Sequence, residues 1–239
     1  MDIKKFARKC ASKLIPLSVK SQLVNFNTLS VKYGQFKTIR RWECVDSSNA
    51  KIPWYTYPII EYLDNIDFSD KIVFEYGSGN SSAYWAKKAK LVFSVEHDKE
   101  WHKKISKNLA ENQTIDLCEN EKDYLDAIYK MPSKMDVIII DGLYREKCAK
   151  LVKENLINGG IVILDNADWY KETSRFLRED LDLLEVDFHG FGPINAYTWT
   201  TSIFFSRASR LHPINNVQPH YSMAAVKNDT DTNADEKLN

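Results

Sequence analysis

The sequence lacks long apolar runs and paired cysteines. No uninterrupted apolar stretch reaches the ~18 residues that a membrane-spanning helix requires. The first residues carry charges without the apolar core of a secretory signal, so we expect a protein of the cytoplasm. The four cysteines form no CxxC pair, which fits reduced thiols better than a disulfide framework or a zinc site.

Net charge is also missing, because 33 basic and 33 acidic residues cancel. A neutral chain has no overall field that attracts nucleic acid, so we expect no nucleic-acid partner. With 239 residues, of which 44% are hydrophobic, the chain is long enough for one sizeable domain with a real core.

The cations gather at the N-terminus. Up to Arg41 the chain has ten lysines and arginines and a single acid, Asp2. Apolar residues at helical spacing occur there, namely Ile3, Phe6, Ala7, Cys10 and Leu14. Basic residues lie between them. Such a helix can lie weakly on an anionic membrane surface, or it can dock its apolar side on the domain, which is the commoner arrangement.

Composition divides the chain into three parts. Residues 1–50 form the basic N-terminal helical segment, and residues 51–211 form the main domain. From 212 to 239 the chain is polar and ends in "NDTDTNADEKLN". That composition buries too little apolar surface to order itself, so we predict a disordered tail.

Short apolar runs alternate with helical patterns in the main domain. We expect strands over 71–76, 91–96, 115–117, 135–141, 160–165, 183–191 and 198–207. A helix over 144–157 is expected to stop at Gly159, because glycine commonly follows a helix C-terminus. This alternation predicts the α/β class, with a mostly parallel, doubly wound sheet.

Acidic residues stand at the carboxyl ends of these strands, where doubly wound sheets bind their ligands. They are Glu75, Glu96, Asp123, Asp141 and Asp165. Core packing explains them poorly, because buried acids need partners. The turn after the first strand contains Gly77 and Gly79, which let the backbone approach a ligand closely.

Two cofactors suit this turn. Glu96 stands nineteen residues after Gly77, about the spacing at which a dinucleotide site binds a ribose. However, Ser82 replaces the third glycine of the GxGxxG fingerprint, and Glu75 would repel a pyrophosphate. An acid at this turn attracts an ammonium or a sulfonium instead, so S-adenosylmethionine is favoured and an NAD(P)-dependent oxidoreductase is the alternative.

The segment "VFEYGSGNSS" (73–82) resembles the ExGxG loop of the class I S-adenosylmethionine-dependent methyltransferases. "VFSVEHD" is similar to their second strand with its ribose acid, and "MDVIIIDG" and "LINGGIVILDN" are similar to their fourth and fifth strands. The resemblance covers roughly 58–207, and Ser81 departs from it where many members have a third glycine. It implies a Rossmann-like, seven-stranded sheet in the order 3-2-1-4-5-7-6, with an antiparallel last strand, and it makes 51–211 the methyltransferase domain.

The resemblance also implies a cofactor site, comprising Glu75, Tyr76, Gly77, Ser78, Gly79, Glu96, His97, Asp123, Tyr124 and Asp141. The glycine loop would hold the methionine part and Glu96 the ribose hydroxyls. His97, Asp123 and Tyr124 would border the adenine. Alternatively, His97 is a surface histidine and Asp123 caps a helix.

A second resemblance concerns the caffeoyl-CoA-type O-methyltransferases, which place an Asp after the fourth strand and an Asp-Asn pair after the fifth. By this resemblance Asp141, Asp165 and Asn166 would bind a divalent cation such as Mg²⁺, because oxygen ligands suit hard cations. The alternative is a site without metal, with Asp141 beside the cofactor or substrate and 165–166 capping the next segment.

An oxygen acceptor benefits from a base, and the candidates are Asp141, Asp165 and His189. We expect the acceptor pocket to form from 53–58 and 189–197, with Trp54, Tyr55, Tyr57, Asn195 and Tyr197 as its side chains. The alternative is that both stretches are packing corners.

The Asn/Asp-Pro-Pro-Tyr/Phe motif of amino-methylating DNA enzymes is missing. Its absence further disfavours a nucleic-acid substrate. We expect methyl transfer to a small molecule, at oxygen. Besides the oxidoreductase, a non-catalytic binding module with the same fold is the alternative function.

Overall fold

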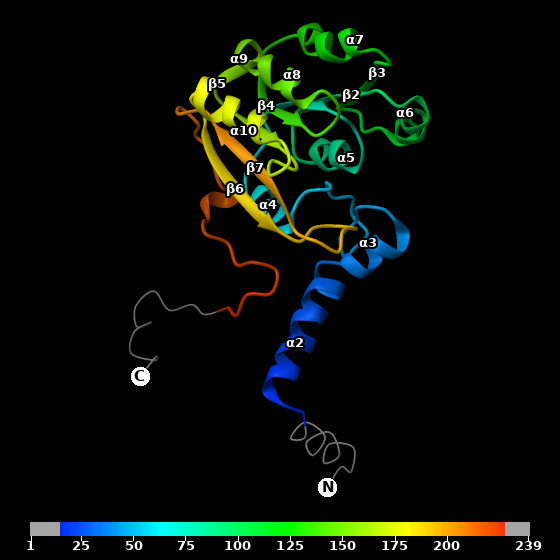
Figure 1. Ribbon diagram of the computed structural model, residues 1–239, viewed down its shortest axis with the longest axis vertical. Helices are drawn as coiled ribbons and strands as arrows, with labels where there is room; N and C mark the ends of the chain where they lie inside the picture. Colours follow the sequence, from blue (N-terminus) through cyan, green and yellow to red (C-terminus); the bar gives the residue numbers. More distant parts are fainter. Residues whose placement is uncertain (1–14, 228–239) are drawn as a thin grey trace.

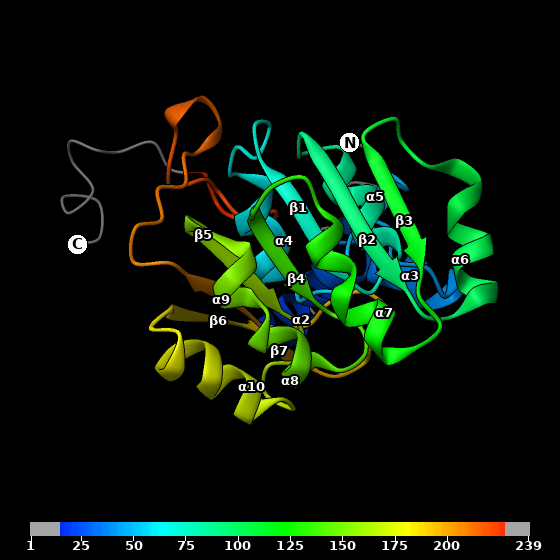
Figure 2. The ribbon, with the colours of Figure 1, turned by 90° about the horizontal axis from the view of Figure 1, so that it is seen from above.

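The structure is a computed structural model that describes residues 15–227, so the helix expected near residues 3–14 lies outside the described part. Its centre is one seven-stranded sheet in the order β3-β2-β1-β4-β5-β7-β6 (Figure 2). The strands are β1 (Ile72–Tyr76), β2 (Leu91–Glu96), β3 (Gln113–Leu117), β4 (Met135–Ile140), β5 (Leu156–Leu164), β6 (Leu184–Gly190) and β7 (Trp199–Phe205).

Strands β1 to β5 pair in parallel, and β7 runs antiparallel to both β5 and β6. The predicted strand order and the antiparallel last strand are therefore confirmed. Strand β4 illustrates why the sheet forms. Its residues 137–140 are buried on both faces, with Val137 and Ile139 in one apolar cluster and Ile138 and Ile140 in the other.

Helices cover both faces of this sheet. α4 (Tyr57–Asp64) and α5 (Asn80–Ala86) contribute to the cluster that contains Val137. The opposite cluster is covered by α7 (Glu121–Asp126), α8 (Arg145–Lys150), α9 (Val152–Asn155) and the segment that follows α10 (Lys171–Arg175). α6 (Lys99–Ile105) begins at Asp98, whose carboxylate accepts a hydrogen bond from the Trp101 N–H at 2.7 Å, as an N-cap does.

One predicted boundary is wrong. The helix expected over 144–157 ends earlier, at Asn155, and β5 begins at Leu156. The two glycines at 159–160 belong to an irregularity in the β4–β5 pairing, where Met135 faces Leu156 but Val137 faces Ile161. Gly159 has φ +97°, so it serves this bulge rather than a helix end.

The N-terminal segment contains α2 (Leu17–Asn27), a π-helical turn (Thr28–Lys32) and α3 (Gln35–Arg41). The Gln35 side chain fixes α3 by donating to the carbonyls of Gly192 and Asn195, both at 3.0 Å. In contrast, α2 has no buried residue and points away from the sheet (Figure 1). No helix within 15–227 is long and apolar enough to cross a membrane.

The first residues of the predicted tail pack on the domain. The N–H of Asp67 donates to the carbonyl of His212, and the N–H of Ile214 donates to the carbonyl of Asn65, both at 2.9 Å. Residues 228–239 lie outside the described part, so the predicted disorder there stays a prediction, as do the domain boundaries.

Candidate cofactor and acceptor site

The glycine loop between β1 and α5 needs glycine for two reasons. Gly77 has φ +102°, a conformation that other residues rarely adopt. Its backbone also presses against Gly142 at the end of β4, because a Cβ added to Gly142 would lie 2.8 Å from the Gly77 nitrogen. This contact brings the β1 and β4 ends together. Gly79 is different, since a Cβ there would make only an ordinary contact with Trp101 at 3.7 Å.

Glu75 lies fully buried at the end of β1 and keeps one oxygen unpaired. Its Oε2 accepts hydrogen bonds from the hydroxyls of Ser82 and Ser94, while Oε1 has no partner. Burial raises the pKa of this carboxyl to about 7, although the serine hydroxyls oppose the rise. A buried, unpaired carboxylate oxygen is costly, so the position suits a ligand that brings a positive charge or a donor.

Glu96 ends β2 beside the same loop and is held by three donors. Its Oε1 accepts the N–H groups of His97 and Asp98, both at 2.9 Å, and its Oε2 accepts the Ser78 hydroxyl at 2.7 Å. The exposed imidazole of His97 also lies 3.0 Å from Oε1. The predicted ribose acid therefore has a fixed orientation, next to the backbone expected to carry the methionine part.

Trp101 borders this site, and sequence analysis missed it. Its indole N–H donates to the carbonyl of Ser78 at 2.9 Å, so the ring lies against the glycine loop. The ammonium of Lys104 lies 4.6 Å from the centre of this ring. In the sequence, Trp101 could have been found from its position, one turn into the helix that follows Glu96.

Two predicted cofactor residues point to the other face of the sheet. Successive residues of a strand alternate between faces, so Tyr76 points away from Glu75. Its hydroxyl donates to the carbonyl of Leu125 at 3.1 Å, and its ring packs against Tyr124 at 5.7 Å. Both tyrosines are fully buried in the core cluster of that face. Of Tyr76, only the backbone therefore borders the loop. The Tyr124 hydroxyl lies against Gly142, next to the loop, because a Cβ added to Gly142 would clash with it. The part of both residues in the cofactor site stays a prediction.

Asp123 lies in the first turn of α7, whose N-cap is Asn120 rather than Asp123 itself. The Asn120 side chain caps α7 by accepting the Asp123 N–H at 2.9 Å, and it donates to the Asp123 carboxylate at 2.7 Å. Asp123 is exposed and engaged in this capping pair, which supports the structural role over a contact with adenine.

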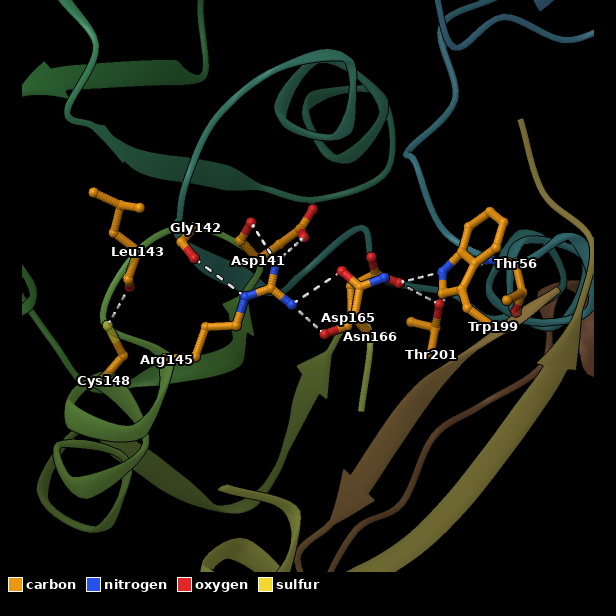
Figure 3. A network of polar contacts seen from close by, with 10 residues as sticks. All are labelled: Thr56, Asp141, Gly142, Leu143, Arg145, Cys148, Asp165, Asn166, Trp199 and Thr201. Atoms are coloured by element: carbon orange, nitrogen blue, oxygen red, sulfur yellow. Dashed lines mark hydrogen bonds and ion pairs between the residues drawn. The ribbon is translucent and has the colours of Figure 1, made fainter. Parts of the chain in front are cut away.

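The guanidinium of Arg145 links the ends of β4 and β5 (Figure 3). It lies 3.2 Å from the Asp141 carboxylate and donates to the Asn166 side chain at 3.2 Å and to the Asp165 carbonyl. One side of the guanidinium faces the ring of Tyr170 at 4.5 Å. With only 9% of its side chain exposed, Arg145 is a buried cation at the place expected for a metal.

This arrangement favours the alternative of a site without metal. Within 15–227 no group of three or more His, Cys, Asp or Glu side chains is placed to hold a metal ion. The Asp165 carboxylate turns away from Asn166, and its Oδ1 accepts the Trp199 indole N–H at 3.0 Å and the Thr201 hydroxyl at 2.5 Å. Arg145 supplies a positive charge to the side-chain oxygens of Asp141 and Asn166. In the sequence, the i,i+4 spacing of Asp141 and Arg145 could have indicated this ion pair.

Three carboxyl groups act on the electrostatics of one buried phenol, Tyr55. Burial raises the pKa of the Tyr55 hydroxyl, and the charges of Glu75, Asp141 and Asp165 raise it further. The Tyr55 hydroxyl has no hydrogen-bond partner. Burial also raises the pKa of Asp141 and of Asp165, and Arg145 opposes the rise at both. We name Tyr55, Glu75, Asp141 and Asp165 the carboxyl cluster.

The two predicted acceptor stretches lie side by side. The N–H of Tyr57 donates to the carbonyl of Phe191 at 2.7 Å, and the Thr56 hydroxyl donates to the carbonyl of Phe188 at 2.9 Å. Gly192 permits this approach, because a Cβ there would lie 2.3 Å from the Tyr55 carbonyl oxygen. The predicted meeting of the two stretches is therefore observed.

Only some of the side chains predicted for the acceptor pocket lie at the carboxyl cluster. Tyr55 alone joins the carboxyl cluster. Trp54 and Tyr197 are exposed, and the Tyr57 ring packs beside Tyr33 at 4.7 Å. Asn195 is partly buried, and its carbonyl accepts the Gln35 side chain.

His189 lies apart from the carboxyl cluster, contrary to its predicted role. Its Nδ1 lies 2.7 Å from the Thr200 hydroxyl. Because neighbours in β7 alternate, Thr200 points to one face and Thr201, which donates to Asp165, points to the other. His189 lines a separate cavity of about 310 Å³ together with Lys171.

No protein-family model matches this sequence, and no curated protein matches it. Solved structures do resemble the chain. A Streptococcus mutans methyltransferase in complex with SAH is 18% identical, with a TM-score of 0.46, over 62% of this chain and 97% of that one. Fibrillarin, a pre-rRNA processing protein of Methanococcus jannaschii, is 16% identical, with a TM-score of 0.49, over 66% and 78% of the two chains.

Such distant likeness concerns the fold alone, and the strand order of the sheet itself decides the fold. The chain has the fold of the class I methyltransferases. The comparisons do not support the more specific resemblance to the caffeoyl-CoA-type enzymes. The carboxyl ends of β1, β2, β4 and β5 thus form the candidate site of a methyltransferase fold.

Proposed function

We propose that this chain is an S-adenosylmethionine-dependent methyltransferase that acts on a small molecule at oxygen. The observation that carries the proposal is the unpaired, buried Oε1 of Glu75 beneath the glycine loop. An anionic oxygen in this place suits a cationic ligand and disfavours the pyrophosphate of NAD(P). The unpaired Cys44, Cys118 and Cys148 support a cytoplasmic location.

The residues at the loop fit this cofactor in two parts. The backbone of 77–79 would lie along the methionine part, with Glu75 balancing its ammonium charge. Glu96 would accept hydrogen bonds from the ribose hydroxyls. The Ser78 hydroxyl, which donates to Oε2 of Glu96, would then share this oxygen with the ribose or give up its hydrogen bond. S-adenosylmethionine, when bound, supplies a methyl group activated by the sulfonium charge.

The remaining task of the protein is to align an acceptor and to keep water away from it. Asp165 is our candidate base, because its carboxyl is buried and its pKa is raised by burial and by Asp141. Its Oδ1 is held by Trp199 and Thr201, while Oδ2 has no hydrogen-bond partner within the described residues. Oδ2 would accept the proton of the acceptor hydroxyl, and Tyr55 would orient that hydroxyl.

Thermal unfolding with added ligands tests the proposal, because a ligand bound only by the native state raises stability by mass action. S-adenosylhomocysteine should raise the melting temperature, while NADH should leave it unchanged. Transfer of labelled methyl from S-adenosylmethionine to a pool of small hydroxylated metabolites then separates an enzyme from a non-catalytic binding module. Stabilisation by NADH alone would contradict the proposal.

A further inference from the structure

The helices α2 and α3 expose a large apolar surface. None of the residues of α2 is buried, and the exposed fraction is 66% for Phe26, 71% for Trp42 and 79% for Leu17. We name this set the N-terminal apolar surface, comprising Leu17, Val19, Leu23, Val24, Phe26, Val31, Phe36, Ile39 and Trp42. Soluble monomers rarely leave so many large side chains in one region uncovered, so the surface points to a binding partner.

The apolar residues of α2 lie on two sides of the helix. At 100° per residue, Leu23 and Phe26 share one side and Leu17 lies on another, and the only charged residue of α2 is Lys20. Figure 1 shows this helix standing free of the sheet on one side of the domain. Exposed apolar side chains on two sides of α2 need apolar surroundings on both, which a shallow groove on another protein would not supply.

The charges within residues 15–42 have one sign, and the exposed Glu43 follows directly after them. Residues 15–42 contain five lysines and arginines and no acid. They are Lys20, Lys32, Lys37, Arg40 and Arg41. Apolar and aromatic side chains combined with cations alone complement a surface that is anionic outside and apolar beneath.

We propose that the N-terminal apolar surface docks the protein on an anionic lipid bilayer. The apolar side chains of α2 would enter the boundary between headgroups and acyl chains, and the cations would lie among the anionic headgroups. A second copy of this chain is the less suitable occupant. A two-fold symmetric contact would place the same cations of both copies against each other.

Docking in this way would turn the predicted acceptor stretches toward the lipid. Trp42 at the end of α3 lies edge-on to Trp54, with ring centres 6.3 Å apart. α3 is also fixed to the connection between β6 and β7, because the Ile194 N–H donates to the Thr38 hydroxyl at 2.8 Å. The α3 part of the surface therefore lies beside both acceptor stretches.

Co-sedimentation with vesicles tests this proposal on the full chain. The protein should sediment with phosphatidylcholine vesicles that contain phosphatidylglycerol, and it should bind vesicles of phosphatidylcholine alone far more weakly. The variant K20Q/K32Q/R40Q should bind the anionic vesicles on the order of a hundredfold more weakly, at about fivefold for each cation removed. The variant L23S/V24S/F26S should lose more than about tenfold, because the side chains that enter the bilayer are gone.

The matched control is K103Q/K107Q/K153Q, which removes three exposed lysines elsewhere and should bind like the wild type. Equal melting temperatures would show that the variants are folded. Three results would overturn the proposal: no sedimentation of the wild type, equal binding by K20Q/K32Q/R40Q and the wild type, or a lipid-free dimer that L23S/V24S/F26S converts to monomer. The last result would assign the surface to a second copy.

Discussion

The guanidinium of Arg145 lies 3.2 Å from Oδ1 of Asp141, four residues earlier in the chain. The same group donates to the carbonyl oxygens of Asp141, Gly142 and Asp165 and to the Asn166 side chain. Arg145 therefore joins the ends of β4 and β5 through five acceptors. Of the three side chains from which a metal site was predicted, Arg145 contacts those of Asp141 and Asn166, whereas the Asp165 carboxylate is held by Trp199 and Thr201.

We predict that Arg145→Gln destabilises the fold by about 3 kcal/mol, the lower end of the range for breaking a buried ion pair. The loss arises because Asp141 and several buried carbonyls lose their donor. Urea unfolding would measure it. Lys147→Gln is the matched control, since it removes the exposed pair with Glu121 and should change stability by less than about 1 kcal/mol. Equal stability of the two variants would contradict the role given to Arg145.

A second prediction concerns the glycine loop. Gly79→Arg should abolish binding of S-adenosylhomocysteine while the protein stays folded, because a Cβ at Gly79 clashes with nothing and its side chain would fill the ligand space. Glu96→Ala should weaken binding by on the order of 1–3 kcal/mol, as expected for hydrogen bonds to a charged group. Calorimetry measures both, with exposed Glu100→Ala as the control. Wild-type affinity in Gly79→Arg would place the cofactor elsewhere.

The raised pKa of Glu75 predicts a pH dependence. The pKa lies at about 7 in the folded protein against 4.5 ordinarily, so the unliganded fold is most favoured below pH 4.5 and loses stability as the pH rises toward 7. This group alone accounts for roughly 3 kcal/mol. Asp141 and Asp165 shift in the same direction, so the comparison must be between variants.

Glu75→Gln should therefore lose less stability than the wild type between pH 5 and pH 8, as followed by urea unfolding at each pH. The amide carries no charge that burial can penalise. The same variant should bind S-adenosylhomocysteine more weakly at pH 8, where wild-type Glu75 is ionised. An unchanged pH profile would show that another group controls the stability in this range.

The acceptor side supplies a fourth prediction. Asp165→Asn should reduce turnover at least about a hundredfold, as for loss of a general base, while S-adenosylhomocysteine still binds. Tyr55→Phe should also lower turnover but leave stability nearly unchanged, because its buried hydroxyl has no partner to lose. His189→Ala, on the opposite face, should keep wild-type turnover. Loss of activity in His189→Ala with normal activity in Asp165→Asn would reverse our assignment.

Local patterns in the sequence determined most of the fold and the place of the site. Apolar, β-branched runs such as 135–140 specify buried strands, and alternation with helices specifies a parallel sheet. Glu75 and Glu96 could be placed at strand ends because the end of a strand and the turn after it are short-range features. For the same reason Gly77 was identified as a turn residue before its positive φ was known.

Only the tertiary structure decided which of these residues meet. The pairing of His189 with Thr200 and of Asp165 with Thr201 follows from the register of β7 between β5 and β6, which depends on contacts between distant segments. The position of the Arg145 guanidinium could not be predicted, because a long, flexible side chain is directed by the acceptors around it. Those acceptors come together only when the ends of β4 and β5 lie side by side.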